Sequence, residues 1–115
     1  MKTIKQFTTT IRRDATRYLS FPDVVKTTSG KLVCAFRNSD RHYPPTRLET
    51  YLELMDSTDE GKTWHNHRQF PHNPKGREQY SWHCPRLTLM KDGRIALLCD
   101  LGSTEVKPEI YLCFS

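Results

Sequence analysis

The sequence lacks the long apolar segments that mark membrane and secreted proteins. No stretch approaches the roughly 18 consecutive apolar residues that span a bilayer. Residues 1–20 are polar and basic, without the apolar region of a secretory signal. We therefore expect a cytoplasmic protein that does not contact a membrane.

Apolar residues are scarce throughout, at 36% of 115 residues. Leu, Ile, Val and Phe together number 24, which is just above the level at which disorder is expected. The length allows one small domain or a piece of a larger one. A large independent core is not expected.

Cysteine pairs with metal-site spacing are also missing. Because no signal peptide is visible, we expect free buried thiols rather than disulfides. These thiols belong to Cys34, Cys84, Cys99 and Cys113. His65-x-His67 would place two imidazoles on one strand face, but no cysteine or carboxylate converges on them in sequence, so no metal and no cofactor is predicted.

The formal net charge is +5, and basic residues gather at the N-terminus. Such a segment attracts phosphate or other anions. However, no aromatic residues are interleaved and no nucleic-acid motif accompanies the charge. We interpret residues 1–17 as a solvated basic leader, with nucleic-acid or phosphate binding as the weaker alternative.

The chain contains an internal repeat. Residues 21–36 (FPDVVKTTSGKLVCAF) match residues 84–99 (CPRLTLMKDGRIALLC) without a gap, at an offset of 63. Each copy predicts a strand, a tight turn with glycine at the positive-φ position, and a second strand. The proline of each copy is expected at the strand entrance, where its missing N–H does least harm.

A third strand follows in both copies, since residues 52–57 match residues 110–115. The first copy continues into a fourth strand around residues 65–70. This predicts one four-stranded unit over residues 18–79 and an incomplete unit over residues 80–115. Antiparallel units that recur about every 60 residues are typical of β-propeller blades, with a β-sandwich as the alternative.

A turn motif lies between the third and fourth strands of the first unit: Ser57-x-Asp59-x-Gly61-x-Thr63-Trp64. Asp accepts hydrogen bonds from nearby backbone N–H groups, Gly adopts the φ that other residues resist, and the Trp is expected to pack between sheets. The motif resembles the Asp box, or BNR repeat, of the sialidase (neuraminidase) superfamily. This resemblance implies an all-β, six-bladed propeller in which the Asp box is structural.

Tracing the chain through an up-and-down unit predicts where a site forms. The Asp box and the first hairpin turn share one rim of the unit. The opposite rim combines residues 17–22, 37–49, 80–86 and 100–109. We expect any functional site to be built from these four segments.

The resemblance also implies candidate site residues. Sialidases bind a substrate carboxylate with three arginines and use a Tyr nucleophile with Glu and an Asp acid/base. Ser20 stands where the first arginine is expected, so the pattern is broken there. Arg41 best fits the next arginine, with Arg37 as the alternative, and Asp40 is the candidate acid/base. The other triad members and the Tyr/Glu pair are expected in later blades.

In the second unit, Trp82 and Arg86 are candidates for lining a sugar pocket by stacking and carboxylate pairing. Core packing of the Trp with a surface Arg is the alternative. The resemblance implies a fragment of a glycoside hydrolase that acts on sialic acid or another anionic sugar, inactive as this chain alone. A non-catalytic glycan-binding propeller is the alternative function. Open blade edges predict self-association.

Overall fold

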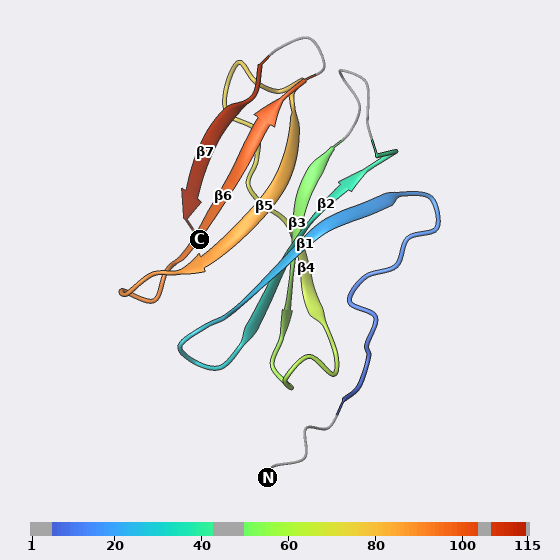
Figure 1. Cartoon of the computed structure of the whole chain (residues 1–115), viewed down its shortest axis with the longest axis vertical. Coiled ribbons are helices and arrows are strands. Elements are labelled where there is room, and N and C mark those ends of the chain that lie inside the picture. Colours follow the sequence, from blue (N-terminus) through green and yellow to red (C-terminus); the bar gives the residue numbers. More distant parts are fainter. Residues whose placement is uncertain (1–5, 43–49, 104–106, 115) are drawn as a thin grey trace.

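The computed structural model describes residues 6–42, 50–103 and 107–114, and these form an all-β fold of two antiparallel sheets (Figure 1). The strands are β1 (Tyr18–Lys26), β2 (Leu32–Ser39), β3 (Tyr51–Ser57), β4 (His65–Gln69), β5 (Ser81–Leu89), β6 (Ile95–Gly102) and β7 (Glu109–Phe114). No helix within these described ranges is long and apolar enough to cross a membrane.

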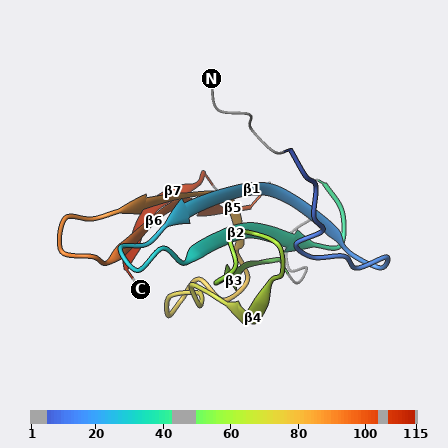
Figure 2. The same cartoon turned by 90° about the horizontal axis from the view of Figure 1, so that it is seen from below.

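Each strand pairs with its neighbour along the chain. The first sheet has the order β1-β2-β3-β4 and the second has the order β5-β6-β7. In Figure 2 the first four strands follow one another from β1 at the top to β4 at the bottom. The predicted all-β class is confirmed, with antiparallel sheets of four and three strands. The division into a unit of residues 18–79 and an incomplete unit of residues 80–115 stays a prediction. Assembly into a propeller stays a prediction, because two sheets do not define a ring.

The two hairpin turns of the repeat have the same geometry. Gly30 and Gly93 adopt φ values of +89° and +88°. In the first turn the N–H of Gly30 donates to the carbonyl of Thr27 (3.0 Å), and in the second the N–H of Gly93 donates to that of Met90, also at 3.0 Å. The sequence repeat therefore encodes a repeated backbone conformation.

The prolines of the repeat do not lie at strand entrances, and that prediction is wrong. Pro22 and Pro85 lie inside β1 and β5, each within a bulge. In the first sheet Ser20 pairs with Arg37 and Asp23 pairs with Ala35, so β1 has one more residue than β2 between these pairs. β5 has the same extra residue relative to β6. A bulge residue has no partner in the ladder, so the missing N–H of proline costs no hydrogen bond there.

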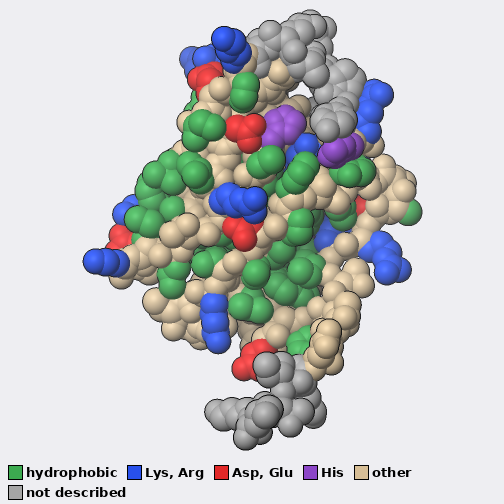
Figure 3. All heavy atoms as spheres, viewed as in Figure 1, with side chains coloured by type: hydrophobic (Ala, Val, Ile, Leu, Met, Phe, Trp, Pro, Cys, Tyr) green, Lys and Arg blue, Asp and Glu red, His purple; other side chains and the backbone are tan. Residues whose placement is uncertain are grey.

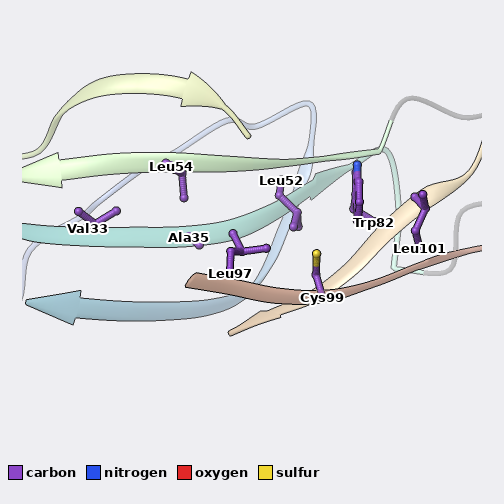
Figure 4. Packing of buried hydrophobic residues seen from close by; sticks show 8 residues of the cluster. All are labelled: Val33, Ala35, Leu52, Leu54, Trp82, Leu97, Cys99 and Leu101. Carbon is purple, nitrogen blue, oxygen red and sulfur yellow. The ribbon is translucent and has the colours of Figure 1, made fainter. Parts of the chain in front are cut away.

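The core lies between the two sheets (Figure 4). The first sheet contributes aliphatic side chains from β2 and β3, and the second contributes aliphatic side chains, a cysteine and a tryptophan from β5 and β6. The buried members are Val33, Ala35, Leu52, Leu54, Trp82, Leu97, Cys99 and Leu101. A hydrogen bond also joins the sheets, because the N–H of Leu87 donates to Asp23 Oδ2 at 2.7 Å.

The N-terminal segment packs on the other face of the first sheet, so a fully solvated leader is wrong for its described part. Ile11 packs against a small cluster built around Phe36. Thr9 Oγ1 donates to the carbonyl of Gly61 (2.8 Å), and Arg17 Nε donates to Asn38 Oδ1 at 2.6 Å. Basic residues of this segment therefore help to hold the fold.

The turn motif after β3 has the expected internal hydrogen bonds. The N–H and hydroxyl of Thr63 donate to the two carboxylate oxygens of Asp59 at 2.9 and 2.6 Å, and Ser57 Oγ donates to Oδ1 at 2.8 Å. These donors lower the pKa of Asp59 to about 2. Gly61 has a φ of +87°. These residues form a closed turn away from the opposite rim.

Trp64 does not pack between the two sheets, contrary to the prediction. Its indole N–H donates to the carbonyl of Gly61 (3.0 Å), and its ring packs with Cys34, Phe36 and Met55. These residues alternate along β2 and β3 with the side chains that face the second sheet. Trp64 therefore covers the outer face of the first sheet.

The outer face of the second sheet is exposed and apolar. Leu98, Ile110 and Leu112 are exposed there, although their repeat counterparts in the first sheet are buried. Figure 3 shows hydrophobic side chains gathered on the left of the molecule, over this sheet. Self-association was predicted from the open blade edges and stays a prediction. This exposed apolar face is a second surface through which two chains could associate.

The repeated turns generate a test of the repeat. We predict that Gly30→Ala and Gly93→Ala each lower the free energy of unfolding by about 1 kcal/mol, because a Cβ strains this backbone region. Gly30→Asn, which tolerates positive φ, is expected to cost less than Gly30→Ala. Urea denaturation followed by circular dichroism measures all three. Unequal costs for the two Ala variants would contradict equivalent turns.

Candidate functional site

A cavity of about 430 Å³ opens between the two sheets at the rim opposite the turn motif of residues 57–64. All four segments predicted to share this rim contribute to it, which confirms the chain tracing. Its lining residues are Phe21, Arg37, His42, His83, Cys84, Asp100, Gly102, Ser103 and Pro108.

Two strained residues line this cavity. Phe21 and Cys84 adopt φ values of +54° and +47°, although neither is glycine. Each directly precedes the proline of its repeat, inside the bulge of β1 or β5. Such conformations cost of order 1 kcal/mol or more and gather at functional sites. The strain occurs twice, at equivalent positions, and both residues line the same cavity.

Arg37, near the end of β2, is the buried cation of the cavity. Only 2% of the residue is exposed. Its Nη1 contacts His83 Nδ1 at 3.0 Å, and its Nη2 donates to Ser39 Oγ (3.0 Å) and to the carbonyls of Arg41 and His42. The guanidinium is thus held by neutral acceptors from both sheets.

Asp100 is a carboxylate whose charge acts on Arg37, and it lines the same cavity. Among the described residues, no carboxylate forms an ion pair with Arg37, and its Nε has no hydrogen-bond partner. Burial lowers the pKa of Arg37, opposed by the charges of Cys84, Tyr18 and Asp100. An arginine stays protonated in proteins all the same. A buried cation that forms no ion pair is costly to the fold, so its neutral hydrogen-bond partners are needed to hold it there.

His83 contacts this cation as a neutral imidazole. Burial, and then the charge of Arg37, lower the pKa of His83, while Asp100 opposes both. Because a guanidinium only donates, Nδ1 is the acceptor and the proton of the neutral ring lies on Nε2. That N–H is a second donor of the rim.

The two candidate arginines, Arg37 in β2 and Arg41 in the segment after it, lie in different surroundings. Arg41, the first choice from the sequence, has a side chain that is 61% exposed and pairs with Asp40, with Nε 3.6 Å from Oδ2. Neither residue is among those that line the cavity. Arg37, the alternative, is the one that the structure buries there. Asp40 is therefore not positioned as an acid/base for this cavity.

Trp82 and Arg86, the candidates for lining a sugar pocket in the second unit, are not among the residues that line the cavity. Trp82 is fully buried in the core between the sheets, and its indole N–H donates to Asn73 Oδ1 at 2.8 Å. Arg86 is exposed and lies opposite Leu98, so both face outward from the second sheet. For both residues the alternative interpretation, core packing and a surface arginine, is the one observed.

Ser20 does not take the place of the expected first arginine. It lines a separate groove of about 350 Å³ between the N-terminal segment and the first sheet, beside Arg12. Its repeat counterpart is His83, which does reach the cavity and contacts Arg37. The two equivalent positions therefore face different neighbours.

Some residues of the cavity were not found as site residues from the sequence. Phe21 and Cys84 enter it only because of the bulges, and Asp100 and His42 come from loop and strand ends. The sequence signal for these two residues was that each directly precedes the proline of its repeat, Phe21 before Pro22 and Cys84 before Pro85, at the offset of 63. Cys84 is also exposed rather than buried, contrary to prediction.

The histidines of β4 form a different contact. His67 Nε2 lies 2.8 Å from Glu53 Oε2, so a carboxylate does approach this strand. Within the described part of the chain, no group of three or more His, Cys, Asp or Glu side chains is placed to hold a metal ion.

No family model matches the chain, and a search of the curated proteins finds no match. The resemblance to sialidases therefore depends on the repeat and on the Asp-box residues of the sequence.

The position of Trp82 generates a stability test. We predict that Trp82→Ala costs about 3–5 kcal/mol of unfolding free energy, because it leaves a large cavity in the core. Trp82→Phe keeps most of the volume and loses the bond to Asn73, so about 1–2 kcal/mol is expected. Chemical denaturation measures both. A Trp82→Ala variant of wild-type stability would place this ring outside the core.

The lowered pKa of His83 generates a pH test. The unfolded chain protonates His83 near its ordinary pKa of about 6.5, before the folded chain does. Stability contributed by the neutral ring is therefore present above pH 6.5 and lost as the pH falls through the lower folded pKa. We predict that His83→Asn flattens this acid-side decline in urea denaturation midpoints. An unchanged pH profile would contradict the assignment.

Proposed function

We propose that this chain forms sialidase-like propeller blades whose rim cavity binds the carboxylate of an acidic sugar. The observation that carries the proposal is Arg37, a buried guanidinium that lines the cavity and has only neutral partners among the described residues. A carboxylate is the planar anion that matches a guanidinium best.

The walls of the cavity support a sugar as the body of the ligand. Arg37 Cζ lies 5.2 Å from the centre of the Phe21 ring, and the Phe21 and His42 rings are stacked with centres 5.9 Å apart. Aromatic faces suit the apolar faces of sugar rings. The volume of about 430 Å³ is within the range of small-molecule sites.

Binding without catalysis is the function that fits this chain best. The acid/base predicted from the sequence, Asp40, is paired with Arg41 outside the cavity. Asp100 is the carboxylate that does line the cavity. The Tyr/Glu pair that the resemblance implies is expected on other blades, so hydrolysis is proposed only for a larger assembly.

A titration with matched ligands tests this function. We predict that N-acetylneuraminic acid binds and that its uncharged methyl ester binds about tenfold or more weakly, as expected for loss of charge-assisted hydrogen bonds. Arg37→Gln should lose the same factor. Isothermal titration calorimetry measures the affinities, after circular dichroism has shown that the variant is folded.

Two exposed arginines are the matched controls. Arg41→Gln and Arg86→Gln remove the same charge from residues outside the cavity lining, so each should change the affinity less than twofold after correction for screening. Equal losses in all three variants, or equal binding of acid and ester, would contradict the proposal.

A further inference from the structure

The outer face of the second sheet is equivalent, through the repeat, to a face that this chain already buries. On the outer face Arg86 pairs with Leu98, and Leu98 pairs with Leu112 on the next strand. The equivalent row of the first sheet, paired in the same way, consists of Asp23, Ala35 and Leu54. Ala35 and Leu54 are buried in the core beneath the second sheet. The repeat therefore indicates that a face of this kind packs against another β-sheet.

The second sheet's outer face has no such cover among the described residues. Ile110 is 71% exposed, Leu112 is 57% exposed and Leu98 is 47% exposed. Phe114 is exposed too and extends this apolar surface to the end of β7. Single exposed apolar side chains are ordinary on a protein surface, but a contiguous group on adjacent strands indicates an interaction site.

A second copy of the chain offers two outer faces, and that of its first sheet is the less suitable one. The residues that already cover it are Ile11, Leu19 and Trp64. The hydrogen bond that joins the sheets within the chain, from the N–H of Leu87 to Asp23 Oδ2, is also not repeated there. Arg86 stands at the position equivalent to Asp23, and a guanidinium only donates. Head-to-tail stacking of copies, second sheet on first sheet, is therefore disfavoured.

The size of the face is sufficient for a weak dimer. The second sheet has three strands, and β7 is six residues long. Strands lie about 4.8 Å apart and rise about 3.3 Å per residue, so this face measures roughly 15 by 20 Å. Two such faces in contact remove on the order of 1,000 Å² of accessible surface from water, which is near the lower limit for a specific interface.

We propose that two copies of this chain associate back to back, with the outer faces of their second sheets packed against each other. Both copies contribute the same surface, so the contact is isologous and closes after two copies. Burial of the exposed apolar side chains drives the association. The inference does not depend on the proposed function, because these side chains, Leu98, Ile110, Leu112 and Phe114, are not among those that line the rim cavity.

Sedimentation equilibrium of the intact chain tests the proposal. For so small an interface we expect a dissociation constant on the order of 10 µM. As the concentration is raised from well below to well above this value, the mass should rise from 13.5 kDa to twice that and no further.

Two substitutions within the face test where the copies meet. Ile110→Lys and Leu112→Lys each place an ammonium group in the contact, so each should weaken association by about tenfold or more. Both side chains are exposed in the single chain, so neither substitution should unfold it. Circular dichroism checks that the variants are folded before their masses are compared.

Val24→Lys is the matched control on the first sheet. Val24 is 53% exposed and lies in the outward-facing row with Cys34 and Met55. This variant should dimerise as the wild type does, whereas head-to-tail stacking would make it lose association. A chain that stays monomeric at every concentration, a mass above two copies, a dimer that survives both lysines in the face, or a loss of association in Val24→Lys would each overturn the proposal.

Discussion

One extra residue in β1 and one in β5 determine how the rim of this protein is built. Each bulge holds a proline that needs no N–H partner, preceded by a non-glycine residue with positive φ. The bulges bring Phe21 and Cys84 into a single cavity. Beyond each bulge the strands regain their register and pack the core. The two bulges therefore separate the part of each strand that lines the cavity from the part that pairs regularly beside the core.

The second constraint is the burial of Arg37. A guanidinium is costly to remove from water, and here it is compensated by His83 from the second sheet and by neutral oxygens of its own loop. The contact with His83 joins the two sheets at the rim, as Asp23 and the N–H of Leu87 join them at mid-strand. Among the described residues no carboxylate forms an ion pair with Arg37, and an anionic ligand as its partner is what we propose.

The sequence predicted most of the fold because the repeat is local. Glycines 30 and 93 locate both hairpins, and alternating apolar residues locate the third strands. The turn motif was predicted from five residues whose side chains bond mainly within the turn. In each case the determining contacts lie within a few residues of one another, where sequence spacing is informative.

The site was predicted at the level of segments and missed at the level of side chains. Arg37 lies near the end of β2 and Arg41 follows four residues later, and the contact of Arg37 with His83, 46 residues away, cannot be seen in the sequence. Trp82 is equally suited to a sugar pocket and to a core, and the docking of the second sheet decides between the two. A bulge at proline has no signature in a single sequence beyond the proline itself.

Binding of an anion at Arg37 is best followed on the arginine itself. In a ¹⁵N-labelled chain, the Nε–H signal of Arg37 is assigned by its loss in Arg37→Lys and followed during titration with N-acetylneuraminic acid. We expect a saturating shift of this signal that the methyl ester does not reproduce. A signal that stays in place while the sugar binds elsewhere, or that moves equally with the ester, would contradict anion binding at Arg37.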